Sequence, residues 1–121
     1  MIFHGNPPYL ECSSKGDKRF SAFYARIEAR NAKSIETIYQ AAKIFADGST
    51  GLTWQQAKGR RAVNQEEITK LYSKLWDEYI EENPHLLVIL KNSSGLSDMF
   101  GKNGHCCQAT ELWRIRNADS V

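Results

Sequence analysis

Residues 64–82 form the segment that most constrains how this chain can fold. Asn64 followed three residues later by Glu67 is typical of the first turn of a helix. Apolar side chains then recur at helical spacing along one wide face: Ile68, Leu71, Tyr72, Leu75, Trp76 and Tyr79. The segment therefore predicts a long helix, ending near Glu82, that buries one face in a core.

Length and composition place this helix in one small domain. The chain has 121 residues, 41% hydrophobic and 25% charged, so we expect a single packed domain over residues 1–121. No apolar run is long enough to span a membrane, and the start of the chain is too polar for a signal peptide. The three cysteines (Cys12, Cys106 and Cys107) are an odd number and two are adjacent, which argues against disulfides and for a cytoplasmic protein. The net charge of +2 permits a nucleic-acid partner without requiring one.

Shorter elements are expected before the long helix. Residues 23–30 alternate apolar and polar side chains, which predicts a strand with one buried face. Ser34 can cap a helix that we expect to run to the glycine at position 48. Thr53 and Gln56 can form a capping box for a second helix through about Arg61.

Further elements are expected after it. Asn83 and Pro84 have the composition of a helix start, so the apolar run over residues 86–90 predicts a short buried helix, with a strand as the alternative. Residues 91–104 are polar and glycine-containing, which indicates a long loop, and residues 106–116 predict a final helix.

Glu36, Gln40 and Lys43 recur along one side of the predicted helix after Ser34. In a pocket wall, the glutamate could act as acid, base or nucleophile, and the lysine could hold a phosphate or attack a sugar aldehyde. The same residues lie opposite the apolar side of that helix, which is also the pattern of an ordinary solvent-exposed face. The two interpretations differ in whether other elements cover this face.

Residues 58–61 read Lys-Gly-Arg-Arg and form a basic cluster. The planar guanidinium of Arg60 suits a phosphate, because it can donate two parallel hydrogen bonds, and Gly59 would let the backbone approach a ligand closely. A charged helix surface is the alternative interpretation.

The histidines and cysteines lack the spacing of a metal site, since His105, Cys106 and Cys107 are consecutive and no Cys-x-x-Cys pair exists. We therefore expect no metal and no cofactor. The three tryptophans fall in predicted helices and are expected to pack in the core. Phe20 lies before the predicted strand and Tyr24 at its start, and these two residues are the better candidates for stacking on a base.

Several short motifs together resemble the NADAR family. Residues 20–23 are similar to its Phe-Ser-Asn-Phe segment, and residues 34–43 to its Ser-Glu-His and Tyr-or-Phe-Gln-Ala-x-Lys helix. Residues 57–60 resemble its Ala-x-x-x-Gly-Arg helix, residues 83–87 its His-Pro-Glu-Leu turn, and residues 100–101 fall where many members have Asp-x-x-Trp-Gly. The order and rough spacing hold over most of the chain.

The resemblance implies a compact α+β fold, mostly α-helical, with a small N-terminal β part. It further implies a hydrolase of the N-glycosidase type, which cuts a base-like group from ribose in a riboflavin-pathway intermediate or in ADP-ribose attached to guanine. The catalytic residues of the family fall on Glu36 and Lys43. Its substrate-binding positions, added to Phe20 and Tyr24, fall on Gln40, Gly59, Arg60, Asp98, Phe100 and Gly101.

The chain also departs from the family pattern. Ala22 stands where the family has asparagine, Thr37 where it has histidine and Phe100 where it has tryptophan. These substitutions favour a second hypothesis, a non-catalytic module on the same fold that binds a nucleotide, a nucleic acid or a protein. Both hypotheses are compatible with a nucleotide or ADP-ribose-type ligand, with a modified nucleic acid and with a cytoplasmic setting, which would be the host cytoplasm for a phage-encoded protein.

Overall fold

A computed structural model describes residues 9–11, 17–92, 95–97 and 108–118 of the chain. The helices are α1 (Ile35–Ala41), α2 (Trp54–Ala57), α3 (Gln65–Glu82), α4 (Pro84–Lys91) and α5 (Gln108–Asn117). The strands are β1 (Tyr9–Glu11), β2 (Arg26–Ile27), β3 (Lys33–Ser34) and β4 (Gly95–Ser97), and single 3-10 turns lie at Lys18–Phe20 and Glu28–Arg30. The predicted class, a mostly α-helical α+β fold, is confirmed.

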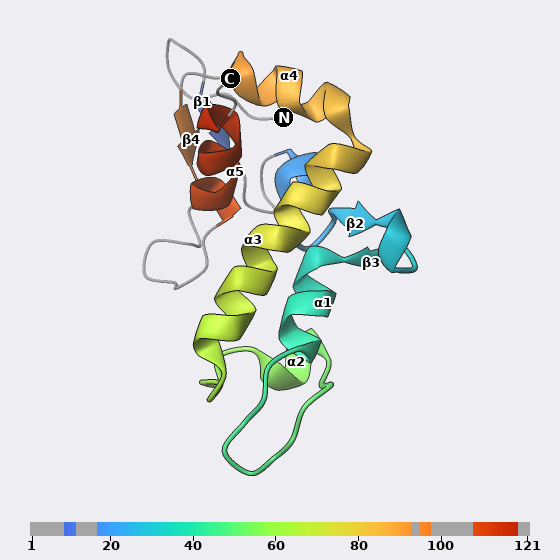
Figure 1. The fold of residues 1–121 in the computed structure, drawn as a ribbon, viewed down its shortest axis with the longest axis vertical. Coiled ribbons are helices and arrows are strands. Elements are labelled where there is room, and N and C mark those ends of the chain that lie inside the picture. Colours follow the sequence, from blue (N-terminus) through green and yellow to red (C-terminus); the bar gives the residue numbers. More distant parts are fainter. Residues whose placement is uncertain (1–8, 12–16, 93–94, 98–107, 119–121) are drawn as a thin grey trace.

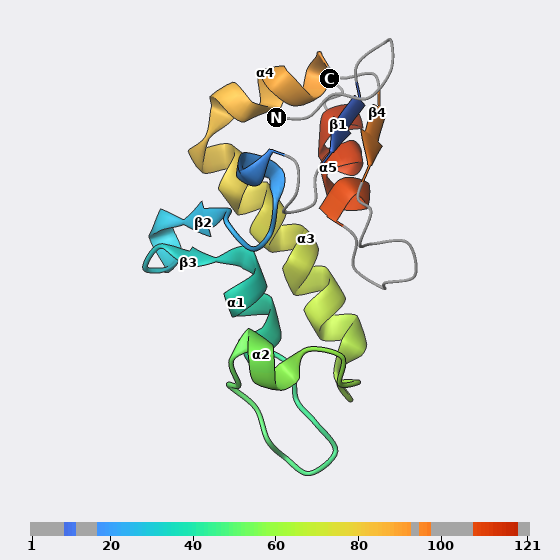
Figure 2. The same cartoon turned by 180° about the vertical axis from the view of Figure 1, so that it is seen from behind.

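Helix α3 runs through the middle of the molecule (Figure 1). Helix α1 and the β2–β3 hairpin lie on one side of it, and α5 with the β1–β4 pair lies on the other, as the view from behind also shows (Figure 2). Strands β2 and β3 are antiparallel, whereas β1 and β4 are parallel. Strand β4 falls inside the segment that was predicted to be a polar loop.

The predicted apolar face of α3 forms the centre of the core. Trp76 is completely buried and makes edge-to-face contacts with Tyr72 and Tyr79, with ring centroids 6.5 and 5.6 Å away. Tyr39 of α1 continues this row of rings, 5.1 Å from Tyr72. The Tyr79 hydroxyl leaves the row to donate a 2.6 Å hydrogen bond to the carbonyl of Arg19, so the row also anchors the segment before β2.

The predicted caps of α1 and α2 are present. The Ser34 hydroxyl accepts from the backbone N–H of Thr37 at 3.1 Å. Thr53 and Gln56 form the reciprocal capping box, with hydrogen bonds of 3.0 and 3.3 Å. Helix α4 begins with Pro84 as its first residue, so the helical interpretation of the apolar run after it was correct.

Helix α1 ends at Ala41, seven residues before the predicted glycine end, and Asn64 provides the physical reason. The Asn64 amide donates to the carbonyl of Ala42 at 3.0 Å and accepts from the N–H of Ile44 at 3.0 Å. These bonds satisfy backbone groups that a continuing helix would have paired. Asn64 stands immediately before α3, where the sequence predicted the helix to start, but its side chain makes no cap hydrogen bond to that helix.

Two other predicted elements are shorter than expected. In the predicted strand over residues 23–30, only Arg26–Ile27 is a strand, because Glu82 accepts from the backbone N–H groups of Glu28 and Ala29 and holds them in a 3-10 turn. Helix α2 ends at Ala57 rather than near Arg61. Gly59 has a φ of 77°, a left-handed conformation that turns the chain out of the helix. Among the described helices, none is long and apolar enough to cross a membrane.

Replacing Asn64 by alanine tests the link between α1 and α3. Because Asn64→Ala removes two hydrogen bonds from groups near the end of α1, we expect the free energy of unfolding to fall by about 1–3 kcal/mol in urea titrations. Asn92→Ala at the exposed end of α4 is the matched control and should change stability by less than about 0.5 kcal/mol. Equal effects of the two substitutions would contradict the assigned role of Asn64.

Candidate functional site

The N-terminal end of α1 is held by the turn that precedes β2. The backbone N–H of Ile35 donates to the carbonyl of Ala25, and that of Glu36 donates to the carbonyl of Ala22, both at 2.9 Å. These carbonyls satisfy donors that the first turn of a helix cannot pair internally. As a result, residues 22–25 lie against the first turn of α1, where Glu36 is.

Glu36, Gln40 and Lys43 do not form a solvent-exposed stripe. Gln40 and Lys43 have only 6% and 7% of their surface exposed, and Glu36 is half-buried. The Gln40 amide Nε2 donates to Glu36 Oε2 at 2.5 Å, so the acid and the amide are directly bonded. Helix α1 packs against both α2 and α3, so neighbouring elements lie against more than one side of it.

Burial raises the pKa of the Glu36 carboxyl group above its ordinary value of 4.5. The hydrogen bond from Gln40 and the positive charges of Lys43 and Lys58 oppose this rise, and burial outweighs them. A carboxyl group whose proton affinity is increased in this way is better suited to give or take a proton than an ordinary exposed glutamate.

The Lys43 ammonium group lies just beyond the end of α1. Its Nζ is 3.5 Å from the carbonyl oxygen of Arg60 and 5.4 Å from the ring centroid of Tyr39. The positive charge of Lys43 favours the ionised form of Glu36, so the two predicted catalytic residues interact electrostatically.

Two aromatic side chains and a lysine complete this region, and sequence reasoning did not assign them to the site. Phe23 and Trp54 meet edge to face with ring centroids 5.3 Å apart, and Lys58 Nζ lies 5.7 Å from the Trp54 ring. Phe23 is 39% exposed and Trp54 is partly exposed, although Trp54 was expected to be in the core. Because aromatic residues usually lie in protein interiors, nothing in the sequence indicated that Phe23 and Trp54 lie at a partly exposed site. The basic cluster containing Lys58, in contrast, could be recognised from the sequence.

Arg60 and Gly59 are placed at the edge of this region. The Arg60 guanidinium stacks 4.0 Å from the ring centroid of Phe45 and lies 3.9 Å from Asp47, so it is held by the loop after α1. The charge that acts on Glu36 from this cluster is that of Lys58. Gly59 is exposed, with open space where a side chain would begin.

The two predicted stacking residues differ in exposure. Phe20 is completely buried in the core, so its ring has no free face for a base, and the assignment of Phe20 to binding is corrected on this ground. Tyr24 is 49% exposed, with the Lys18 ammonium 4.8 Å from its ring centroid.

The remaining predicted positions fall where the structure gives no description. Asp98, Phe100 and Gly101 lie outside the described residues, as do Cys12, His105, Cys106 and Cys107. Within the described ranges, no three histidine, cysteine, aspartate or glutamate side chains are grouped so that they could hold a metal ion.

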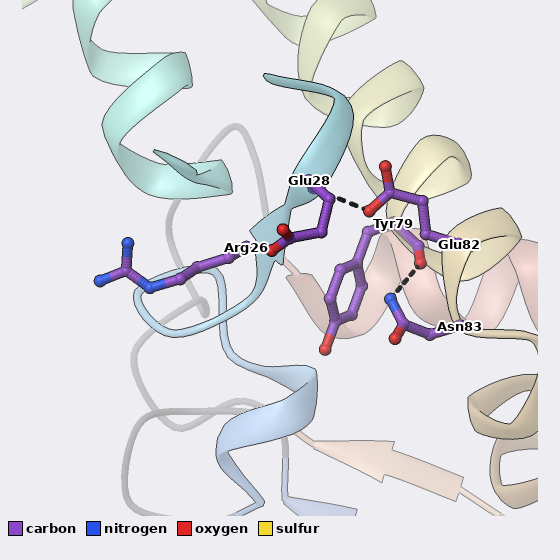
Figure 3. A pocket seen from close by; sticks show the side chains of 5 residues that line it. All are labelled: Arg26, Glu28, Tyr79, Glu82 and Asn83. Atoms are coloured by element: carbon purple, nitrogen blue, oxygen red, sulfur yellow. Dashed lines mark hydrogen bonds between the residues drawn. The ribbon is translucent and has the colours of Figure 1, made fainter. Parts of the chain in front are cut away.

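A surface hollow of about 520 Å³ lies elsewhere, between the β2–β3 hairpin and the end of α3 (Figure 3). It is lined by Arg26, Glu28, Tyr79, Glu82 and Asn83. Its polar groups are largely engaged in structural bonds: Glu82 accepts from the backbone of the hairpin, and Asn83 donates to the carbonyl of Tyr79 at 2.8 Å. Burial also raises the pKa of Tyr79 to about 12, which keeps that phenol protonated. None of the predicted site residues that the structure describes lines this hollow.

Comparisons of the chain with protein-family models, with curated proteins and with solved structures found no match. The resemblance to the NADAR family accordingly rests on the motifs of this sequence.

The raised pKa of Glu36 predicts how the stability of the protein depends on pH. The folded protein binds the Glu36 proton more tightly than the unfolded chain, so stability falls as the pH rises from below about 4.5 through the folded-state pKa, and it stays reduced above that. Glu36→Gln cannot ionise and escapes this loss. We therefore expect the variant to gain stability relative to the wild type between about pH 4 and pH 7.5 in denaturant titrations.

Glu78→Gln is a control of opposite sign. Arg30 lies 2.7 and 2.8 Å from the two Glu78 carboxylate oxygens and lowers the pKa of that group. Glu78→Gln should therefore lose stability relative to the wild type as the pH rises through the lowered folded-state pKa to about 4.5, and the deficit should persist above that pH. We expect a loss of less than about 1 kcal/mol because the pair is partly exposed to solvent. A Glu36→Gln variant that follows the same direction as Glu78→Gln would contradict the assigned burial effect.

Proposed function

We propose that this protein is an N-glycosidase-like hydrolase that acts on a ribose-linked nucleotide or on an ADP-ribose adduct. The observation that carries the proposal is the covered unit formed by Glu36 and Gln40 of α1 and by Lys43 just after it. A desolvated carboxyl group that is hydrogen-bonded to an amide and lies near an ammonium charge is suited to proton transfer. The motif resemblance to the NADAR family points to the same residues.

In the proposed reaction, water adds to the anomeric carbon of the ribose while the bond to the base breaks, and the departing base takes up a proton. Glu36 accepts the proton of the attacking water or stabilises the positive charge that develops on the sugar. Lys43 holds the ribose through its ammonium group. Alternatively, after the base has left, its neutral amine adds to the aldehyde carbon of the opened sugar and water is released as the imine forms; hydrolysis of the imine then returns the amine and the sugar.

The neighbouring side chains fit the remaining parts of such a ligand. Phe23, Trp54 and Tyr24 offer partly exposed aromatic surface for a base. Lys58 and Arg60 supply positive charge for phosphate at the edge of the same region. These contributions explain why one site would take a nucleotide rather than a simple sugar.

The decisive experiment uses Glu36→Gln. The protein is incubated with ADP-ribosylated DNA and with purine and pyrimidine ribosides, and released base or ADP-ribose is quantified. If Glu36 supplies base or electrostatic catalysis, turnover should fall about a hundredfold or more while the protein stays folded, because glutamine keeps the shape but cannot take a proton.

Glu67→Gln is the matched control, since Glu67 is an exposed glutamate in the first turn of α3. It should keep full turnover. A Glu36→Gln variant with near wild-type turnover would refute Glu36 as the catalytic residue. Lys43→Met extends the test to the second catalytic position.

A non-catalytic binding module is the second candidate, and the environment of Ala22 favours it. Ala22 is buried, its N–H donates to Gln108 Oε1 at 2.6 Å, and its carbonyl accepts from Glu36. The position where the family has an asparagine therefore offers no polar side chain to a ligand. On this proposal the wild type binds ADP-ribose without turnover, and Glu36→Gln leaves the dissociation constant within about twofold.

Both candidates predict an anion contact at Arg60. Arg60→Ala should weaken ADP-ribose binding about tenfold in calorimetric titrations, because a guanidinium hydrogen bond to phosphate is charge-assisted. Arg61→Ala, the adjacent exposed arginine, is the control and should change the dissociation constant less than about twofold. Identical affinities for Arg60→Ala and the wild type would remove Arg60 from the site.

A further inference from the structure

Gln40 is an unusual residue to find buried in α1. Only 6% of its surface is exposed, and its amide Nε2 donates to Glu36 Oε2 at 2.5 Å. Its other amide atom, Oε1, is buried and has no hydrogen-bond partner within the described part of the chain. Among the described residues, the hydrogen bond to Glu36 is therefore the one that compensates for removing the Gln40 amide from water.

This arrangement is unfavourable for stability alone. A buried carbonyl oxygen without a partner loses its hydrogen bonds to water and gains none. A methionine has nearly the same length and would fill the position without that loss. The packing of α1 therefore does not explain an amide here, whereas the hydrogen bond to a carboxyl group does.

We propose that Gln40 is a positioning residue for the Glu36 carboxyl group, an inference that rests on the proposed function of Glu36. The two residues are one helical turn apart on the same short helix, so the bond holds Oε2 in a fixed direction. With Oε2 engaged, the second carboxyl oxygen, Oε1 of Glu36, is left for the substrate or the attacking water. Gln40 thereby acts on the reaction through Glu36 and does not itself touch the reacting atoms.

The groups that face Glu36 come from two helices. Lys43, just after α1, and Lys58, just after α2, act on it through their charges, and Gln40 acts as a hydrogen-bond donor. All three favour the ionised carboxylate against burial. Removing only the donor should therefore shift the Glu36 titration to higher pH, while both lysines remain in place.

The test is Gln40→Met, read by carbon-13 NMR of the Glu36 side-chain carboxyl group over a pH titration. We expect three results together: a Glu36 titration midpoint above that of the wild type, a melting temperature equal to or above that of the wild type, and turnover reduced about tenfold or more. For any substrate that the wild type cleaves, the pH profile of turnover should move in the same direction as the midpoint.

Gln65→Met is the matched control. Gln65 also donates to a side chain one turn along its helix, Thr69 at 3.2 Å, but on α3 and away from Glu36. It should leave both the Glu36 midpoint and turnover unchanged.

The wild-type protein offers a second measurement that does not depend on a variant folding. The side-chain amide protons of Gln40 should shift with pH at the same midpoint as the Glu36 carboxyl carbon, because the two groups share one hydrogen bond. The proposal is overturned if the chemical shifts of the Gln40 amide protons do not change over the Glu36 titration. It is also overturned if the Glu36 titration midpoint is the same in Gln40→Met as in the wild type. Either result counts even when Glu36→Gln is inactive. Conversely, an active Glu36→Gln would refute the proposed function while leaving the measured bond between Gln40 and Glu36 intact.

Discussion

Helices α1, α4 and α5 and strand β2 each pack directly against α3, so the burial of one helix face positions most of the described chain. The row of rings from Tyr39 through Tyr72 and Trp76 to Tyr79 fills this interface with large side chains at edge-to-face distances. Because interiors are close-packed, the positions of α1 and of the segment held by Tyr79 are fixed to each other through α3. The candidate site lies on one of the helices that this packing orients.

Helix α1 is covered on two sides, and its chemistry follows from that. Its apolar side packs on α3, and α2 packs against it as well, which brings Gln40 and Lys43 out of water and raises the pKa of Glu36. Burying an acid and an amide on a seven-residue helix, with an amine just after it, lowers stability relative to an apolar surface. Residues that lower stability but suit proton transfer are expected at sites where activity and stability make opposite demands.

The local rules of helix formation predicted much of the fold from particular residues. Ser34, Thr53 with Gln56, and Pro84 each mark a helix start, because a side-chain acceptor or a proline at that point satisfies or avoids an orphan N–H within a few residues. Helix ends were predicted less well. Asn64 ends α1 from 22 residues away in the sequence, and a partner at that distance leaves no local pattern.

The amino-acid sequence by itself determined the α-rich class, the long amphipathic α3, the helix starts and the spacing that puts Glu36 and Gln40 on one side of α1. These depend on interactions within a turn or two of the chain, which residue type and periodicity encode directly. Only the tertiary structure decided that this side is covered, that Phe20 is buried while Phe23 and Trp54 form an aromatic pair near Glu36, and that Lys58 acts on the carboxyl group. Those outcomes depend on which elements pack together, because desolvation and long-range charge are set by neighbours that are distant in the sequence.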